Sequence, residues 1–197
     1  MRILCVGDSM TDRTNDPDDR PFSSDYTPPG PPLGYYPKHL KRILEADVHA
    51  FAAYSHNHDG LAMPTIAEWA VRATSLLKPD LVIVQGGGDD LDPSEPEATI
   101  EETFTHFQTC YEAVIAAGAK CLFLLIPEEH RGKDDPGGKK RRAVNCQLVG
   151  NFPDETLGYY YKLHDHPELL ADGFHPNDEG CKLMAQLIAD KIKEINP

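Results

Sequence analysis

Short apolar runs alternate along the chain with longer segments whose apolar residues recur every three or four positions. Runs of this length are typical of buried strands, and the three-to-four spacing is typical of helices that pack on one side. Strands are expected at Ile3–Val6, Val48–Tyr54, Leu81–Gln85, Cys121–Ile126 and Tyr159–Leu163. Helices are expected at Tyr35–Leu44, Ile66–Leu77, Ile100–Ile115 and Lys139–Val149, and from an N-cap at Asn177 or Asp178 to Ile192. This alternation predicts a single α/β domain over residues 1–197, with a mostly parallel sheet covered on both faces.

Two segments interrupt the alternation and are predicted to be loops. Asp12–Pro37 is rich in proline and aspartate and is interpreted as a loop insertion, because proline lacks a backbone N–H and fixes φ. Long loops inside compact domains are often functional, so we expect this one to line a ligand pocket; a disordered insert is the alternative. Its aromatic residues are the candidates for stacking on a ligand: Phe22, Tyr26, Tyr35 and Tyr36. The second loop, Glu128–Gly138, is charged.

Charge and composition narrow the class of partner. The chain has 19 basic and 32 acidic residues and a net charge of −13, which argues against nucleic acid or an anionic membrane as a partner. No apolar run approaches the ~20 residues that a membrane helix needs. The five cysteines are odd in number and show no CxxC spacing, which favours buried free thiols in a reducing compartment. With no secretory signal pattern at the N-terminus, we expect a cytoplasmic protein.

Polar residues that could carry chemistry follow the predicted strands. Gly7-Asp8-Ser9 ends the first strand, and Asp172 and His175 stand near the C-terminus. Ligands bind at the carboxyl ends of parallel strands, so these segments are expected to meet at one edge of the sheet. A serine hydroxyl needs a neighbouring base, histidine is the usual one, and a carboxylate orients it. The Gly-x-Ser-x-Gly elbow of ordinary α/β-hydrolases is absent, because Thr11 occupies the last glycine position.

In three ordered blocks, from Arg2 to about Ile195, the sequence resembles the SGNH, or GDSL-type, hydrolases. The blocks are Val6-Gly7-Asp8-Ser9, the strand Leu81–Gln85 followed by glycines and two acids, and Leu170–Asn177 followed by Gly180 and a helix. The resemblance implies a three-layer α/β/α sandwich with a flavodoxin-like sheet of about five strands. It makes Ser9 the nucleophile, with Asp172 and His175 completing a triad. The family hydrolyses esters of short acyl groups, lipids or acetylated sugars without a metal, so no metal or other cofactor is expected.

The chain departs from the family at the oxyanion hole, which in the family uses the nucleophile's N–H, a glycine N–H and an asparagine side chain. His56, or alternatively Ser55, occupies the glycine position, and Asp89 replaces the asparagine. An ionised carboxylate only accepts hydrogen bonds, so Asp89 could stabilise an oxyanion only when protonated. Burial and the neighbouring Asp90 would favour that protonation. Asp8 and Gly88 are assigned to the same oxyanion and substrate site.

The leading hypothesis is therefore a serine esterase for a small neutral ester, such as a short acyl ester or an acetylated carbohydrate. The alternative is a catalytically weak or inactive binding protein of the same fold, because Asp89 weakens the oxyanion hole. A third hypothesis places a metal at His56, His58 and nearby aspartates, and His164-Asp165-His166 is a similar, weaker pattern. The basic run Lys139–Arg142 is interpreted as a solvated helix face. No oligomeric state is predicted, since no diagnostic interface is present.

Overall fold

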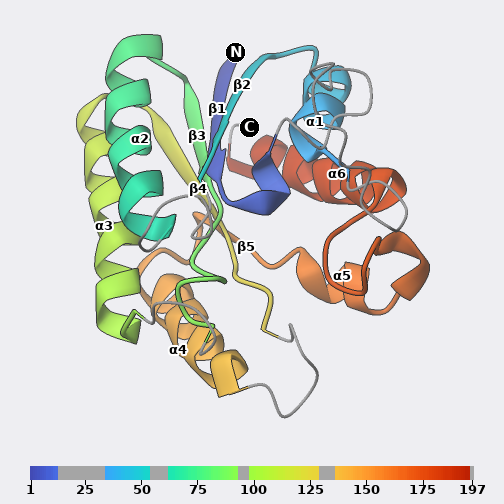
Figure 1. The fold of residues 1–197 in the computed structure, drawn as a ribbon. Coiled ribbons are helices and arrows are strands. Elements are labelled where there is room, and N and C mark those ends of the chain that lie inside the picture. The colour runs from blue at the N-terminus through green and yellow to red at the C-terminus, as the bar shows by residue number, and fades with distance from the viewer. Residues whose placement is uncertain (13–33, 54–61, 93–97, 129–135, 196–197) are drawn as a thin grey trace, which may run out of the picture.

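The computed structural model describes residues 1–12, 34–53, 62–92, 98–128 and 136–195 (Figure 1). Five strands of these residues form one parallel sheet in the order β2-β1-β3-β4-β5, which is the flavodoxin-like order. The strands are β1 (Arg2–Gly7), β2 (Asp47–Ala52), β3 (Leu81–Val84), β4 (Lys120–Leu124) and β5 (Thr156–Leu157). The expected sheet is confirmed, and its strands all run in the same direction.

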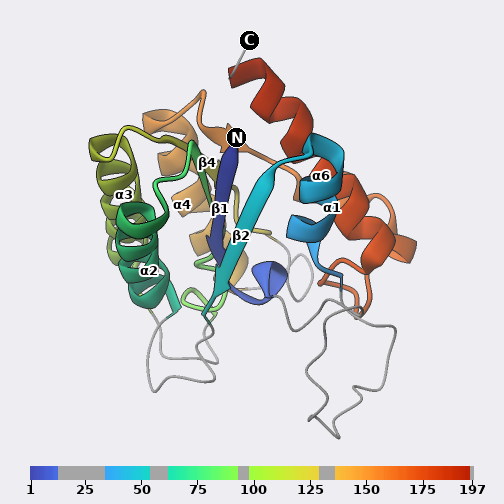
Figure 2. The same cartoon turned by 90° about the horizontal axis from the view of Figure 1, so that it is seen from above.

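Helices cover both faces of the sheet. They are α1 (Tyr36–Leu44), α2 (Ala62–Leu77), α3 (Ile100–Ala116), α4 (Pro136–Asn151), α5 (Tyr160–His164) and α6 (Asp178–Ile195). Figure 1 and Figure 2 show α2, α3 and α4 on one side of the sheet and α1 and α6 on the other. The described part of the chain is thus the three-layer α/β/α sandwich expected from the sequence, and none of its helices is long and apolar enough to cross a membrane.

Alternating side chains of the central strands build two hydrophobic cores. Leu4 and Val6 of β1 pack in the core under α2 and α3, whereas Ile3 and Cys5 pack in the core under α1 and α6. Successive side chains of a strand point to opposite faces, so a strand with helices on both faces must be apolar throughout. This explains why the buried strands have continuous apolar sequences rather than alternating ones.

The expectation of a strand at Tyr159–Leu163 is wrong. Residues Tyr160–His164 form helix α5, and the fifth strand is the short β5, which precedes it. Tyr160 and Leu163 are both buried and stand three positions apart, a spacing that suits one face of a helix. A five-residue segment is too short for its apolar pattern to separate helix from strand.

Three further expectations about individual side chains can be compared with the structure. Tyr35 and Tyr36 form the start of α1 and are buried rather than available for stacking, while Phe22 and Tyr26 lie outside the described residues. Four of the five cysteines are buried free thiols, as expected, but Cys146 on α4 is exposed. The N-cap of α6 is Asn177, whose Oδ1 accepts the Gly180 N–H at 3.0 Å.

Candidate functional site

The end of β1 delivers Ser9 to the carboxyl edge of the sheet. After Gly7 the chain turns into a short 3-10 helix, Ser9–Thr11, which Asp8 caps by accepting the Met10 N–H at 3.2 Å. Thr11 Oγ1 donates to Gln85 Oε1 at 3.2 Å, which ties this turn to the residue that follows β3. Ser9 itself is half-buried. The turn therefore holds the serine hydroxyl in a fixed place while leaving it accessible.

Ser9, His175 and Asp172 form one hydrogen-bonded chain. Ser9 Oγ lies 2.9 Å from His175 Nε2 although the two residues are 166 positions apart. On the other side of the ring, His175 Nδ1 lies 2.7 Å from Asp172 Oδ2. When Nδ1–H donates a hydrogen bond to Asp172, Nε2 carries a lone pair directed at the serine hydroxyl. This is the arrangement in which a histidine can take the serine's proton.

Hydrogen bonds from backbone groups keep Asp172 in its acceptor role. Its Oδ1 accepts the N–H groups of Phe174 at 3.0 Å and His175 at 2.7 Å. Partial burial by itself would raise the pKa of Asp172, but the bonds from the backbone and ring of His175 outweigh it and lower that pKa below its ordinary value. Asp172 thus stays ionised and accepts hydrogen bonds across the neutral pH range.

The loop that carries His175 is held from both sides. Ala171 N–H donates to the His175 carbonyl at 2.7 Å, and Gly34 N–H donates to the Pro176 carbonyl at 2.8 Å. A Cβ at Gly34 would lie only 2.4 Å from the Asn177 carbonyl oxygen, so this close approach requires glycine. The histidine loop is therefore fixed to the start of α1 as well as to its own stem.

Aromatic rings line one side of the histidine. The Phe174 ring meets the His175 ring edge-on at 5.0 Å between centroids, and Tyr160 of α5 packs on Phe174 at 5.7 Å. The Tyr160 hydroxyl donates to the Phe174 carbonyl at 3.4 Å. Helix α5 thus packs against the residue whose ring meets the His175 imidazole.

Three carboxyl groups gather beside the serine turn, and they differ in environment. Asp8 is buried, and burial, with repulsion from Asp89, raises its pKa to about 7. Asp90 is fully buried, and burial raises its pKa to about 6; its Oδ1 accepts the Met63 N–H of α2 at 2.9 Å. Asp89 is half-buried, as is Gly88. The two fully enclosed carboxyls are thus the neighbours of Asp89 rather than Asp89 itself.

Arg141 contacts this same block of residues. The interpretation of Lys139–Arg142 as a solvated face is therefore wrong for Arg141, while Lys139 and Arg142 are exposed as expected. Its side chain is fully buried; its Nε donates to the Gly88 carbonyl at 3.2 Å and its Nη2 lies 3.6 Å from Asp92 Oδ2. A signal for this burial was present in the sequence, because Arg141 precedes the apolar Val144 and Leu148 at helical spacing. The run of like charges obscured that spacing.

Asn145, also on α4, is a second residue that the sequence reasoning missed. It is buried and makes two hydrogen bonds to the backbone of Ile126, just after β4. Its Oδ1 accepts the Ile126 N–H at 2.9 Å, and its Nδ2 donates to the Ile126 carbonyl at 2.8 Å. Helix α4 therefore holds the chain that follows β4 as well as the turn that follows β3.

Some predicted site residues fall elsewhere. Ser55, His56, His58 and Asp59 lie outside the described residues. Within the described ranges, no group of three or more potential ligands is placed to hold a metal ion. His166 pairs instead with Glu168 at an exposed position, 3.0 Å from Nδ1 to Oε1.

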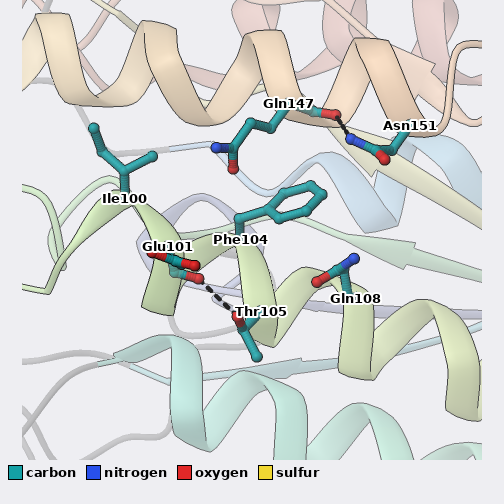
Figure 3. Close-up of a pocket in the computed structure, with 7 residues that line it drawn as sticks. All are labelled: Ile100, Glu101, Phe104, Thr105, Gln108, Gln147 and Asn151. Atoms are coloured by element: carbon teal, nitrogen blue, oxygen red, sulfur yellow. Dashed lines mark hydrogen bonds between the residues drawn. The ribbon is translucent and has the colours of Figure 1, made fainter.

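A cavity of about 530 Å³ lies between α3 and α4 (Figure 3). Side chains of Phe104, Gln108 and Gln147 are among those that line it, together with Ile100, Glu101, Thr105 and Asn151. None of the three residues of the hydrogen-bonded chain belongs to this lining. The cavity is therefore separate from the candidate site.

Comparison with known proteins gives one family match and several solved structures with a similar fold. The chain matches the GDSL-like lipase/acylhydrolase family over residues 5–183, whereas no curated protein matches it. A lipase/acylhydrolase from Enterococcus faecalis has the same fold, with a TM-score of 0.70 and 16% identity over 98% of this chain and 96% of that one. A psychrotrophic esterase from Pseudoalteromonas sp. gives 0.66 and 16% over 100% and 99%. A catalytic mutant of an acetylxylan esterase from Geobacillus stearothermophilus gives 0.68 and 14% over 97% and 93%.

Proposed function

Because the chain belongs to the GDSL-like lipase/acylhydrolase family, we propose that it is a serine esterase that hydrolyses a small neutral ester. One observation carries the proposal: the hydrogen-bonded chain from Ser9 Oγ through the His175 ring to Asp172. A nucleophile, a base and a group that orients the base stand in the order that acyl transfer needs.

In the first half of the proposed reaction, Ser9 Oγ attacks the ester carbonyl carbon while its proton moves to His175 Nε2. The tetrahedral intermediate then collapses, the carbon–oxygen bond to the alcohol breaks, and His175 returns the proton to the departing alcohol. An acyl group remains on Ser9. In the second half, water attacks that acyl group with His175 again taking and returning the proton, so the acid leaves and Ser9 is regenerated. Asp172 stabilises the imidazolium formed in each half without taking its proton.

The oxyanion would be stabilised by the Ser9 N–H, by the N–H at position 56 and, when protonated, by the Asp89 side chain. Next to it, burial and repulsion from Asp89 raise the pKa of Asp8 to about 7, so Asp8 keeps its own proton through mildly acidic pH. A protonated Asp8 adds no negative charge beside the developing oxyanion. Because only a protonated Asp89 can donate to the oxyanion, the proposed activity is expected to fall as the pH rises. Because His175 must be neutral to act as the base, activity is also expected to fall at low pH, which leaves a narrow window.

The proposed substrate is a short acyl ester, and an acetylated carbohydrate is a good candidate. The similarity of the fold to an acetylxylan esterase supports this class. The net charge of −13 also favours a neutral over an anionic substrate.

A second candidate function is a binding protein that retains the fold but turns over its ligand slowly or not at all. The observation that favours it is Asp89 at the position of a family asparagine, because losing one oxyanion donor typically costs ~10²–10³ in turnover. The two functions differ in Ser9-dependent turnover: the esterase shows it, and Asp89→Asn raises it above neutral pH, whereas the binding protein shows none even with asparagine at position 89.

The experiment is hydrolysis of p-nitrophenyl acetate from about pH 4 to about pH 9 by the wild type, Ser9→Ala and Asp89→Asn. A serine esterase predicts that Ser9→Ala abolishes turnover and that Asp89→Asn raises it above neutral pH. If Asp89→Asn leaves activity unchanged or lower at every pH, the proposed role of Asp89 is wrong. If neither the wild type nor Asp89→Asn shows Ser9-dependent turnover, the binding protein is favoured and the esterase proposal fails.

A further inference from the structure

Helix α4 presents a fully buried arginine to the turn that carries Asp89. The turn runs from Gly88 to Asp92 and is closed by the Asp92 N–H, which donates to the Asp89 carbonyl at 3.0 Å. Arg141 reaches both ends of it: Nε donates to the Gly88 carbonyl at 3.2 Å, and Nη2 lies 3.6 Å from Asp92 Oδ2. Asp89 stands between these two contacts.

The contact with Gly88 acts directly on the backbone at Asp89. The Gly88 carbonyl and the Asp89 N–H belong to one peptide unit, which is planar. A hydrogen bond that fixes the direction of the Gly88 carbonyl therefore also fixes the orientation of the Asp89 N–H, and with it the peptide plane that precedes the Asp89 Cα. The opposite side of the turn is held by Asp90, whose Oδ1 accepts the Met63 N–H of α2 at 2.9 Å.

The sequence around Arg141 is adapted to bring α4 close to this turn. A Cβ at Gly137, one helical turn before Arg141, would lie 2.8 Å from the Leu91 carbonyl oxygen and 3.2 Å from Arg141 Cζ. Only glycine lets the first turn of α4 approach the backbone at Leu91 so closely. The fork of a guanidinium can contact a carbonyl and a carboxylate at once, whereas the ammonium of lysine is a single point charge.

We propose that Arg141 is a positioning residue of the esterase site, which fixes the 88–92 turn and thereby places the Asp89 side chain at the oxyanion. This inference rests on the proposed function, in which Asp89 contributes to oxyanion binding. It assigns to α4, which carries none of the triad, the task of setting the geometry of the third oxyanion donor. A purely structural ion pair with Asp92 is the competing explanation.

The test must separate positioning from folding, because removing Arg141 alone would leave Asp92 as a buried carboxylate with its ion pair broken. The main variant is therefore the pair Arg141→Met/Asp92→Asn, which removes both charges together and the bond to Gly88. Arg141→Lys keeps the charge but cannot span both ends of the turn. The matched control is Arg142→Met, the exposed neighbour in the same basic run, which bonds Glu128 at 2.8 Å.

Activity on p-nitrophenyl acetate is measured at the pH of greatest wild-type turnover, in the native background and in Asp89→Ala. Small displacements of a catalytic group can cost about 10²-fold, so we expect the paired variant to lower kcat by about 10- to 100-fold with little change in KM. Arg141→Lys should fall between it and the wild type, and Arg142→Met should match the wild type. In the Asp89→Ala background the paired variant should cost almost nothing further, since the group that it positions is gone. An equal loss in both backgrounds, or no loss in the native one, would overturn the inference.

Hydrogen exchange provides a readout that does not depend on turnover. The paired variant should speed exchange of the amides of residues 85–92 while leaving those of β1 and α6 unchanged. Unchanged exchange at 85–92, or a uniform increase throughout the protein, would overturn the positioning role. A wild type without Ser9-dependent turnover would instead refute the proposed function, and the exchange pattern would then decide about Arg141 by itself.

Discussion

Asp172 contacts His175 through both of its carboxylate oxygens: one oxygen contacts the imidazole ring and the other accepts the backbone N–H. Oδ2 lies 2.7 Å from the ring Nδ1, and Oδ1 accepts the His175 N–H at 2.7 Å. One side chain thus orients the imidazole and also closes the loop that carries it. The two tasks can be separated by substitution, because they use different oxygens.

Asp172→Asn is expected to preserve the conformation of the His175 loop but to abolish most of the esterase activity. The amide oxygen can still accept the backbone N–H groups, but its NH₂ facing Nδ1 favours the wrong ring tautomer, and kcat should fall by about 10⁴-fold. Esterase assays of the purified variant test the expected loss of kcat, and thermal melting tests whether the loop and the fold are retained. Glu168→Gln is the matched control, since Glu168 pairs with the exposed His166 and should not affect turnover. Full activity in Asp172→Asn would refute the role given to Asp172.

Asp8→Asn is expected to change how stability depends on pH. Burial, with repulsion from Asp89, raises the pKa of Asp8 from 3.8 to about 7, so the unfolded chain releases this proton first as the pH rises. The free energy of unfolding therefore falls between about pH 4 and about pH 7. Asparagine still accepts the Met10 N–H but cannot ionise, so the variant should be more stable than the wild type at about pH 8 and not at about pH 4.

Urea denaturation at the two pH values measures this difference. Asp165→Asn, which removes an exposed carboxylate, should show no comparable difference between the two conditions. An Asp8→Asn variant that gains nothing at the higher pH would mean that Asp8 is not a buried, protonated carboxyl.

Two glycines of α4 should respond to alanine in opposite ways. Gly150 has nothing within 4 Å of a Cβ, so Gly150→Ala should stabilise the protein by about 0.5–1 kcal/mol through the helix preference of alanine. Gly137→Ala would force a methyl group to 2.8 Å from the Leu91 carbonyl oxygen and should destabilise by about 1–3 kcal/mol. Chemical denaturation of both variants tests the sign, and a stabilising Gly137→Ala would contradict the close packing of α4 on the turn.

Asn145→Ala should destabilise the protein through the backbone after β4. It leaves both the N–H and the carbonyl of Ile126 without their partner, at about 1–3 kcal/mol for each group. Asn151→Ala removes an exposed amide whose bond lies within α4, and should change stability by less than about 0.5 kcal/mol. Equal free energies of unfolding for the two variants would show that the two Asn145–Ile126 hydrogen bonds contribute little to stability.

The sheet could be predicted because continuous apolar runs mark strands buried on both faces. The grouping of Ser9 with Asp172 and His175 came instead from the ordered blocks of the family resemblance, since His175 lies in a loop before α6 and follows no strand. Arg141 was misinterpreted because the run of like charges obscured its helical spacing to Val144 and Leu148, and because its partner, the Gly88 carbonyl, belongs to another element. Tyr36 was misinterpreted for the second of these reasons, since its burial requires α6 on top of α1.

The bond from the Gly34 N–H to the Pro176 carbonyl has an evolutionary consequence. The chain leaves the site just after Ser9 and returns at Gly34, where it is fastened to the loop that presents His175. This bond joins two backbone groups and uses no side chain of residues 13–33. Substitutions in that part of the sequence are therefore expected to leave the tether between Gly34 and the His175 loop in place as the sequence diverges.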